Sequence, residues 1–420
     1  MTAAPRAGPP APVPALDVGA VGAWLIDGAR SHPDPRDMLA ELCQRLLGAG
    51  LHLWRVAVFV RTLHPEIMAR RFVWRLGAGA ELADGPFELM ERPEYRTSVI
   101  VRVVTDGIAI RRRLVDPGCP MDYSVLPELR AEGVTDYLAT PLFFSNGEIH
   151  LATWTTREPA GFTEAELAAL DAILAPLTRV AEIRALRRTA ANLLNTYVGR
   201  HAGERILAGH IRRGDTEAIH AAIWLSDMRG FTQLADRLPP KALIDLLNRY
   251  FDCQVPAICR HGGEVLKFMG DGLLAIFPIV SGAGAAGNVC KDAFAAASEA
   301  RADVARLAAA TEDEATRGLR FGLALHLGEV LYGNIGSGER LDFTCIGPAV
   351  NLAARLETLA GSLGRSVVAS SAFAGAYGPG LSPLGEFMLA GFSTAETVYG
   401  LADEGGEAAL GATLLADRSR

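Results

Sequence analysis

The sequence contains few lysines and no long apolar run. Its 41 basic residues include only three lysines, Lys241, Lys267 and Lys291, so arginine supplies nearly all of the positive charge. Acidic residues number 48, and the formal net charge of −7 argues against a protein that binds the phosphate backbone of nucleic acid. No apolar segment approaches the roughly 20 residues of a transmembrane helix, so no membrane span is expected.

Cysteine is also scarce, and the six cysteines form no CxxC pair. Because they lie mostly in apolar segments, the pattern predicts buried, reduced thiols and a cytoplasmic protein, and excludes a disulfide framework or a zinc site. The cysteines are Cys43, Cys119, Cys253, Cys259, Cys290 and Cys345. Residues 1–36 begin with an Ala- and Pro-rich stretch without a signal-peptide pattern, which predicts a loosely ordered tail. Residues 402–420 predict a second, flexible tail.

Several common functional signatures are missing. The chain has no repeat of 20–50 residues, which excludes solenoids and propellers. It contains no HExxH, GxSxG or GxxxxGK[ST] motif and no kinase motif set, which removes the usual metalloprotease, hydrolase, P-loop and kinase interpretations. At 420 residues with 50% hydrophobic and 21% charged residues, the composition is typical of two or three globular domains.

Residues 37–160 predict an α+β domain. An amphipathic helix is expected at 38–47, followed by β-branched and aromatic strand runs at 53–60, 71–76, 98–104 and 137–144. The sharpest signal is Asn146-Gly147, between apolar runs at 142–144 and 149–154. This dipeptide is typical of a two-residue hairpin turn.

Residues 161–217 predict a helical linking segment. Thr163 and Glu166 form a capping-box pattern, and the helix is expected to run to about residue 194. Leucines follow at the alternating spacings of three and four that are typical of a coiled coil, interrupted by Pro176. They are Leu167, Leu170, Leu174 and Leu177. This seam either dimerises and transmits a signal or packs on its own domain, and the two alternatives are compatible.

Residues 218–401 hold the readable chemistry. Asp227 ends an apolar strand, and Asp271 lies in the Gly270-Asp271-Gly272 turn between two further strand runs. If these strands are neighbours, the two carboxylates converge at one edge of a sheet. Carboxylate oxygens are the ligands that magnesium and manganese prefer, so the pattern predicts a two-metal site for a polyphosphate. The alternative is that Asp271 only serves the turn.

Two further segments fit a nucleotide. Gly230, Phe231 and Thr232 connect the first strand to a helix N-terminus, whose N–H groups favour phosphate. Lys267 lies in a strand beside the Asp271 turn, where a compact ammonium could bind a ring nitrogen of a base, although it could equally be a solubilising charge. Thr344 ends a later strand, and its hydroxyl can both donate and accept.

A helix is expected to begin at Pro348 after Gly347. Asn351 and Arg355 are four residues apart and therefore share one face of this helix. An amide beside a guanidinium suits a site that holds a ribose and stabilises charge on a transferring phosphoryl group. The alternative for this pair is an ordinary solvated face.

Together these segments resemble the class III nucleotidyl cyclase catalytic domain of adenylate and guanylate cyclases. The resemblance covers roughly residues 218–401 and rests on SDMRGFT at 226–232, GEVLKFMGDG at 263–272 and DFTCIGPAVNLAAR at 342–355. It implies a ferredoxin-like βαββαβ core, in which an antiparallel sheet is flanked by helices. It also implies conversion of ATP to 3',5'-cyclic AMP and pyrophosphate by attack of the ribose 3'-hydroxyl.

The resemblance also assigns roles to individual residues. Asp227 and Asp271 would hold two Mg²⁺ or Mn²⁺ ions, and Lys267 with Thr344 would read the base as the adenine-selecting pair, where guanylate cyclases typically carry Glu and Cys. Asn351 would orient the ribose, and Arg355 would stabilise charge at phosphorus. One departure is the absence of a basic residue between Arg365 and Arg418, where many relatives place a lysine.

In this family the active site forms between two subunits, so the chain is expected to be a homodimer. Residues 37–160 more weakly resemble a GAF sensor domain, which implies regulation of the cyclase by an unidentified small molecule. Residues 197–215 resemble the transducing segment that precedes many cyclase domains. The alternatives are a catalytically silent nucleotide-binding signalling module or a guanylate cyclase. The sequence does not identify the stimulus, the basal activity, the preferred metal or the reader of the product.

Overall fold

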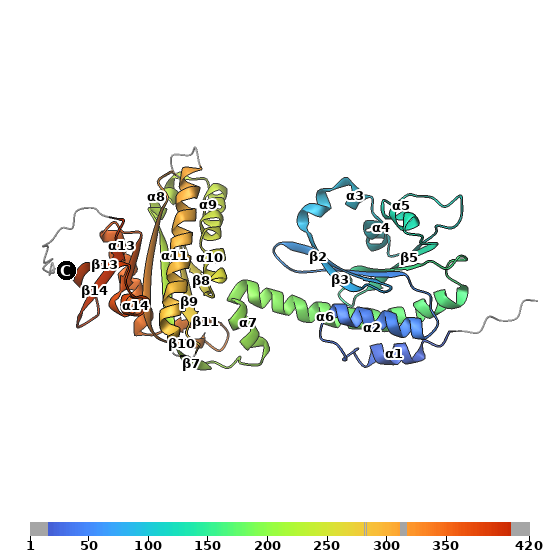
Figure 1. Cartoon of the computed structure of the whole chain (residues 1–420), viewed down its shortest axis with the longest axis horizontal. Coiled ribbons are helices and arrows are strands. Elements are labelled where there is room, and N and C mark those ends of the chain that lie inside the picture. The colour runs from blue at the N-terminus through green and yellow to red at the C-terminus, as the bar shows by residue number, and fades with distance from the viewer. Residues whose placement is uncertain (1–15, 281, 283, 311–316, 405–420) are drawn as a thin grey trace, which may run out of the picture. The chain divides into compact units, whose positions relative to one another are not determined.

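The computed structural model describes residues 16–280, 282, 284–310 and 317–404, and the chain divides after Leu193 into two compact units (Figure 1). The division falls inside the predicted linking segment. The expected tail at 402–420 lies largely outside the described residues, as does the start of the expected tail at 1–36. The remainder of that first tail was wrongly predicted, because Gly19–Ile26 forms helix α1 and buries Val21 and Leu25 in the N-terminal core.

The N-terminal unit contains a six-stranded antiparallel sheet in the order β3-β2-β1-β6-β5-β4. Its strands are β1 Arg55–Arg61, β2 Ile67–Arg75, β3 Gly79–Pro86, β4 Ile110–Arg113, β5 Asp136–Phe143 and β6 Ile149–Thr156. Its helices are α1, α2 Pro35–Gly48, α3 Pro93–Arg96, α4 Val99–Asp106, α5 Val125–Ala131 and the first part of α6 Glu164–Val198, with a 3-10 turn at Phe87–Glu91. Helices α1, α2 and α6 pack on one face, and α4 and α5 on the other.

Two local predictions in this unit were wrong. Residues 98–104 were expected to be a strand, but they lie in α4, where Ser98 caps the N-terminus and Gly107 ends the helix at a φ of 66°. Val99 and Val103, four residues apart, are the positions that face the core, so the helical period prevails over the β preference of valine. The Asn146-Gly147 hairpin was predicted correctly, but its loop has three residues.

The hairpin joins β5 to β6. The N–H of Phe144 donates to the carbonyl of Glu148 at 2.9 Å, which leaves three residues between these partners. Gly147 takes a φ of 86°, the left-handed conformation that closes a three-residue loop of this kind. The GAF resemblance of this unit stays a prediction.

Helix α6 begins with the capping box expected from the sequence. The backbone N–H of Thr163 donates to Glu166 Oε2 at 2.8 Å, and the N–H of Glu166 donates to Thr163 Oγ1 at 3.2 Å. The leucine seam at the start of α6 packs on its own unit, because Leu170 and Leu177 are buried in the N-terminal core and Leu167 and Leu174 pack against it. This outcome favours the second of the two alternatives for these leucines.

The C-terminal unit is built on a sheet in the order β13-β14-β12-β10-β7-β9-β8, with β11 paired to β10. Among the strands that the structure describes in this unit, the β10–β12 pair alone is parallel. The strands are β7 Thr216–Arg229, β8 Glu264–Met269, β9 Gly272–Pro278, β10 Arg320–Gly336, β11 Leu341–Ile346, β12 Val367–Ser370, β13 Leu381–Met388 and β14 Ala395–Leu401. The mainly antiparallel sheet flanked by helices matches the expected architecture.

Helices cover both faces of this sheet. They are α7 Arg200–Leu207, α8 Phe231–Arg237, α9 Pro240–Asp252, α10 Val255–Arg260, α11 Ala285–Ala309, α13 Pro348–Ser362 and α14 Ser371–Tyr377. Helices α9, α10, α11 and α14 enclose the larger core on one face, and α13 and α7 pack on the other (Figure 1). The second face carries the candidate site, because β11 and α13 bring their side chains to it.

All six cysteines are free thiols, as expected. Their predicted burial holds for Cys43, Cys290 and Cys345, whereas Cys259 is exposed. Among the described residues, no helix combines the length and apolarity that crossing a bilayer requires.

Candidate active site

The two aspartates singled out from the sequence lie side by side. Asp227 stands two residues before the end of β7, and Asp271 lies in the turn that joins β8 to β9. Strands β7 and β9 are antiparallel neighbours, with Ser226 opposite Leu273, so the strand pairing brings the turn to Asp227. The carboxyl groups of Asp227 and Asp271 are close enough to interact electrostatically.

This arrangement changes the acidity of Asp227. Its pKa is raised to about 7, first because the carboxyl is partly buried and then because the like-charged Asp271 lies beside it. Glu357 adds to the rise, and Arg229 opposes it. Two neighbouring carboxylates repel each other, and a bound cation relieves that repulsion. The raised pKa therefore marks a place where the protein concentrates uncompensated negative charge.

The donor set fits a hard divalent cation. Two carboxylates offer oxygen ligands, and the concentrated charge is what a magnesium or manganese ion would neutralise. Within the described ranges, no group of three or more His, Cys, Asp or Glu residues is arranged to hold a metal. Asp227 and Asp271 would thus supply only part of a coordination shell, and this suits an ion that is also bound by nucleotide phosphates and water.

A glycine keeps the two carboxyls close. A β-carbon on Gly272 would lie 3.1 Å from the carbonyl oxygen of Ser226 and 3.4 Å from Asp227 Oδ1. The backbone of the turn can therefore approach β7 only because position 272 has no side chain.

Lys267 and Thr344 belong to the same face of the unit. Lys267 lies on β8, and its Nζ is 3.2 Å from Oδ2 of Asp342, which is two residues before Thr344 on β11. Alternate residues of a strand share a face, so Asp342 and Thr344 point to the same side of β11. Packing therefore places Lys267 beside the strand that carries Thr344, although the two residues are 77 positions apart in the chain.

Thr344 carries a polar atom without a partner. Its side chain is only 4% exposed, and Oγ1 is buried without a hydrogen bond to any described residue. An orphaned buried hydroxyl costs about 1–3 kcal/mol, so its retention calls for an explanation. A ligand atom that donates or accepts at Thr344 would provide one.

Helix α13 places Asn351 and Arg355 on its exposed side. Both side chains are exposed and make no hydrogen bond or ion pair within the described part of the chain. Glu357, on the opposite side of the helix, instead turns towards the core and forms an ion pair of 2.7 Å with Arg229. Arg229 also donates to the carbonyl oxygen of Glu357 at 3.0 Å, and so fastens α13 to the end of β7.

The segment 230–232 connects β7 to α8. Gly230 has a φ of 79°, which favours glycine, and Phe231 and Thr232 form the start of the helix. The side chain of Phe231 packs against the larger core of the unit. Only its backbone is therefore left to face a phosphate.

The sequence interpretation missed Arg229, Glu357 and Asp342. Arg229 reaches α13 by passing over Gly322 and Gly361, where a β-carbon would lie 2.5 Å and 2.9 Å from its guanidinium. The only local signal was the position of Arg229 two residues after Asp227. Asp342 was quoted within a motif but was given no role, because its contact with Lys267 depends on how β8 and β11 pack.

The family of the C-terminal unit follows from comparison. Residues 216–388 match the family model of the adenylate and guanylate cyclase catalytic domain. This segment is a cyclase catalytic domain. It contains the two aspartates, Lys267, Thr344, Asn351 and Arg355.

Curated relatives of the cyclase domain occur in mycobacteria. Uncharacterised proteins of Mycobacterium tuberculosis and Mycobacterium bovis are each 36% identical to the chain over 176 residues, which are 41% of this chain and 31% of those proteins. The chain thus spans about a third of the length of the curated relatives that it matches.

Solved structures similar to the chain include adenylyl and guanylyl cyclases. A bacterial light-regulated adenylyl cyclase is 28% identical with a TM-score of 0.38, covering 44% of this chain and 92% of that one. An adenylyl cyclase from P. aeruginosa is 27% identical with a TM-score of 0.39, covering 45% and 96%. A guanylyl cyclase is 27% identical with a TM-score of 0.38, covering 44% and 93%.

Proposed function

We propose that the protein is an adenylate cyclase that converts ATP to 3',5'-cyclic AMP and pyrophosphate. The ribose 3'-oxygen bonds to the α-phosphorus, the bond from that phosphorus to the pyrophosphate oxygen breaks, and the hydroxyl proton is released. The juxtaposition of Asp227 and Asp271 carries this proposal, because two neighbouring carboxylates at the end of β7 can hold a cation. A bound Mg²⁺ or Mn²⁺ ion supplies charge neutralisation for the triphosphate and the attacking oxygen.

Adenine selection is assigned to Lys267 and Thr344. The Lys267 ammonium can donate to a ring nitrogen, and the buried, unpartnered Thr344 hydroxyl can bind the exocyclic amino group. In the absence of nucleotide, Lys267 is held by Asp342, so binding of the base exchanges one partner of the ammonium for another. We expect Lys267→Glu with Thr344→Cys to shift the nucleotide preference from ATP to GTP.

The remaining roles follow from the placement of α13 and the 230–232 turn. Asn351 orients the ribose, Arg355 stabilises charge at phosphorus, and the backbone of Gly230, Phe231 and Thr232 binds phosphate. Lys267 and Arg355 provide the positive charge for the nucleotide, since the chain has no basic residue between Arg365 and Arg418.

The helix geometry favours an active site shared by two chains. Successive helix residues are about 100° apart, so Arg355 and Glu357 point to nearly opposite sides of α13. Glu357 faces Arg229, next to the Asp227 of the same chain, and Arg355 therefore points away from that aspartate. A second copy of the chain can bring its Asn351 and Arg355 to the metal carboxylates of the first. The N-terminal unit would regulate this dimer.

Product formation by the purified full chain tests the activity. ATP or GTP is supplied with Mg²⁺ or Mn²⁺, and cyclic nucleotide is measured by HPLC. Asp227→Asn should reduce cyclic AMP formation on the order of 100-fold or more, because it removes a charged cation ligand without changing the shape of the side chain. Asp245→Asn, which removes an exposed carboxylate of α9, is the matched control and should leave the rate unchanged.

A mixing experiment tests the shared site separately. Asp227→Asn and Arg355→Ala chains should each be inactive, but a mixed dimer contains one site with both intact residues. Random mixing in equal amounts should therefore restore about a quarter of the wild-type rate. A mixture that stays inactive would place both residues in a site within one chain.

A further inference from the structure

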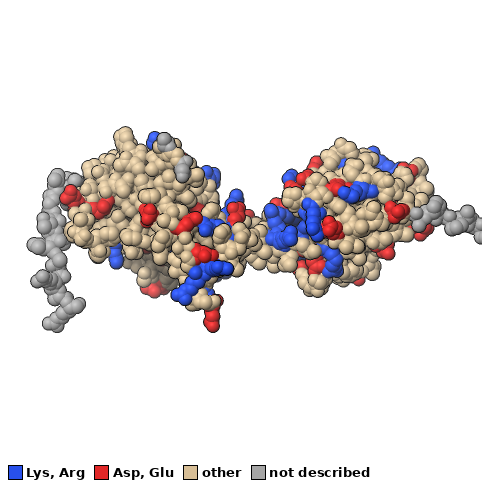
Figure 2. Space-filling view, turned by 90° about the horizontal axis from the view of Figure 1, so that it is seen from below, with Lys and Arg blue, Asp and Glu red and all other residues tan. Residues whose placement is uncertain are grey.

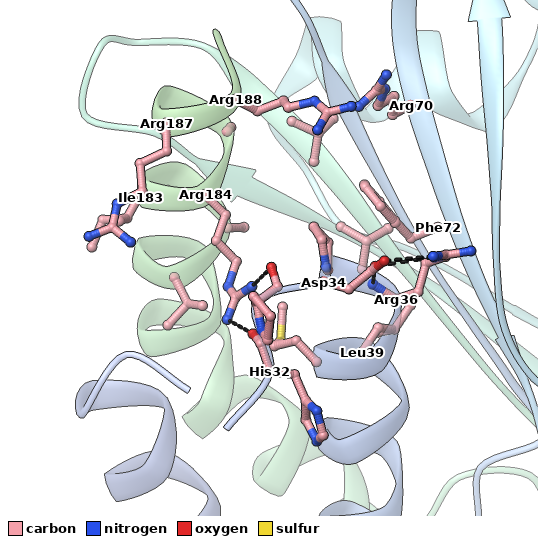
Figure 3. A pocket seen from close by; sticks show the side chains of 18 of the residues that line it. His32, Asp34, Arg36, Leu39, Arg70, Phe72, Ile183, Arg184, Arg187 and Arg188 are labelled. Carbon is pink, nitrogen blue, oxygen red and sulfur yellow. Dashed lines mark hydrogen bonds and ion pairs between the residues drawn. The ribbon is translucent and has the colours of Figure 1, made fainter. Parts of the chain in front are cut away.

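A large cavity lies in the N-terminal unit, and every residue that lines it belongs to that unit. Its volume is about 1090 Å³, and it lies between α2, α6 and strands β1, β2 and β3 (Figure 3). Apolar side chains form much of its lining. They include Leu39, Val58, Val60, Phe72, Leu177 and Val180. The volume lies just above the range of about 300–1,000 Å³ that is usual for small-molecule sites, and the apolar lining is typical of them.

The same cavity is strongly basic at its edges. Seven arginines line it, against two aspartates, which leaves five excess positive charges in a protein whose net charge is −7. The arginines are Arg30, Arg36, Arg61, Arg70, Arg184, Arg187 and Arg188. Figure 2 shows basic side chains gathered on one face of this unit. Such a concentration costs free energy through repulsion, so it indicates an anion as the missing partner.

Four of the seven guanidinium groups already have protein partners. Arg30 and Arg36 pair with the two lining aspartates, and Arg70 pairs with Asp84 at 3.0 Å. Arg184 donates to three backbone carbonyls of the loop before α2, namely those of Ala29, His32 and Pro33. Arg30, Arg36 and Arg70 therefore form charge pairs with aspartates. Arg184 bonds only to neutral carbonyl groups in these contacts, so it keeps its full charge beside the cavity and holds the loop before α2 in place.

The other three guanidinium groups, those of Arg61, Arg187 and Arg188, make no hydrogen bond or ion pair with any described residue. Figure 3 shows Arg188 extending from α6 towards Arg70 on β2, across the cavity. Arg187, one position earlier, is directed to the other side of α6 together with Ile183. Arg70 pairs with Asp84, whereas the guanidinium of Arg188 forms no ion pair within the described residues and is left to meet an anion.

We propose that this cavity binds a small organic anion with an apolar body, whose carboxylate or phosphate group is held by Arg188 and Arg70 and whose body lies against Phe72 and Leu39. Planar guanidinium groups bind both kinds of anion through paired hydrogen bonds. Such a ligand uses both properties of the cavity, since an inorganic anion would leave the apolar lining in water and a neutral molecule would leave Arg188 without a counter-charge. The inference does not depend on the cyclase activity.

Isothermal titration of the full chain tests the site with three probes of the same ring system. 1-Naphthyl phosphate and 1-naphthoate carry the two candidate head groups, and 1-naphthol lacks the charge. We expect at least one anionic probe to bind and 1-naphthol to bind at least about 10-fold more weakly. The stronger of the two anions identifies the head group. The proposal is overturned if neither anion binds at millimolar concentration, or if 1-naphthol binds as well as they do.

Substitutions of one lining arginine and one arginine outside the lining locate the binding. Arg188→Ala should weaken the anionic probe at least about 10-fold, because it removes a charge-assisted hydrogen bond to the head group. Arg71→Ala removes the same charge from a β2 residue that does not line the cavity, and it should retain most of the affinity. Both residues are exposed, so neither substitution threatens the fold. Equal losses in the two variants, or no loss in Arg188→Ala, would refute this site.

Discussion

The contact of Arg229 with Glu357 makes a quantitative prediction about how the cyclase domain holds α13. The two side chains are only 20% and 13% exposed, and their ion pair is 2.7 Å long. An exposed pair contributes about 0.5 kcal/mol, whereas removing one partner of a buried pair costs about 3–5 kcal/mol. We therefore expect Arg229→Ala to destabilise the local contact between β7 and α13 by about 2 kcal/mol.

Gly322→Ala should produce the same loss by a different route. Its new β-carbon would lie 2.5 Å from three atoms of the Arg229 guanidinium, so the arginine would have to leave its position. We expect this variant also to cost about 2 kcal/mol, because it removes the same ion pair. Once Arg229 is already alanine, the methyl group meets no guanidinium. The double variant should therefore cost about 2 kcal/mol rather than about 4 kcal/mol.

Hydrogen–deuterium exchange of the full chain measures this coupling without requiring the two units to unfold together. A local loss of 2 kcal/mol accelerates exchange about 30-fold at amides of β7 and α13 that exchange through that opening. Gly375→Ala, where a β-carbon meets no atom within 4 Å, is the matched glycine control and should leave exchange there unchanged. Additive losses in Arg229→Ala and Gly322→Ala would refute the shared mechanism.

Three smaller predictions follow from single contacts. His326 is buried and bonded to Ser370 Oγ at 2.8 Å, and burial lowers its pKa from 6.5 to about 4. As the pH falls from 6.5 to 4, the imidazole of His326 becomes protonated in the unfolded chain before it does in the folded chain. The free energy of unfolding, measured by urea denaturation, should therefore fall by up to about 3 kcal/mol more in the wild type than in His326→Gln. Gly272→Ala should reduce cyclic nucleotide formation about 10- to 100-fold by displacing Asp227, and an unchanged rate would contradict the close packing of that turn. Ser98→Ala should destabilise α4 by about 1 kcal/mol, visible as faster amide exchange confined to that helix.

Much of the cyclase domain could be predicted from the sequence because its signals are local. Gly347-Pro348 marks the start of α13, and the spacing of Asn351 and Arg355 places both on one face, since helix geometry is set by neighbours in the chain. The Thr163 capping box and the Asn146-Gly147 hairpin are local in the same sense. Where two local signals disagreed, as in the valine-rich helix α4, the sequence alone gave the wrong element.

The tertiary structure decided which distant residues meet. Pairing of β7 with β9 sets Asp271 against Asp227, and packing of β8 near β11 gives Lys267 its partner Asp342. The arginine-lined cavity is a further case, because Arg70 and Arg188 come from a strand and a helix more than 100 positions apart. Side-chain contacts of this kind depend on sheet order and helix packing, which are properties of the whole unit. No pattern within one segment of the sequence contains them.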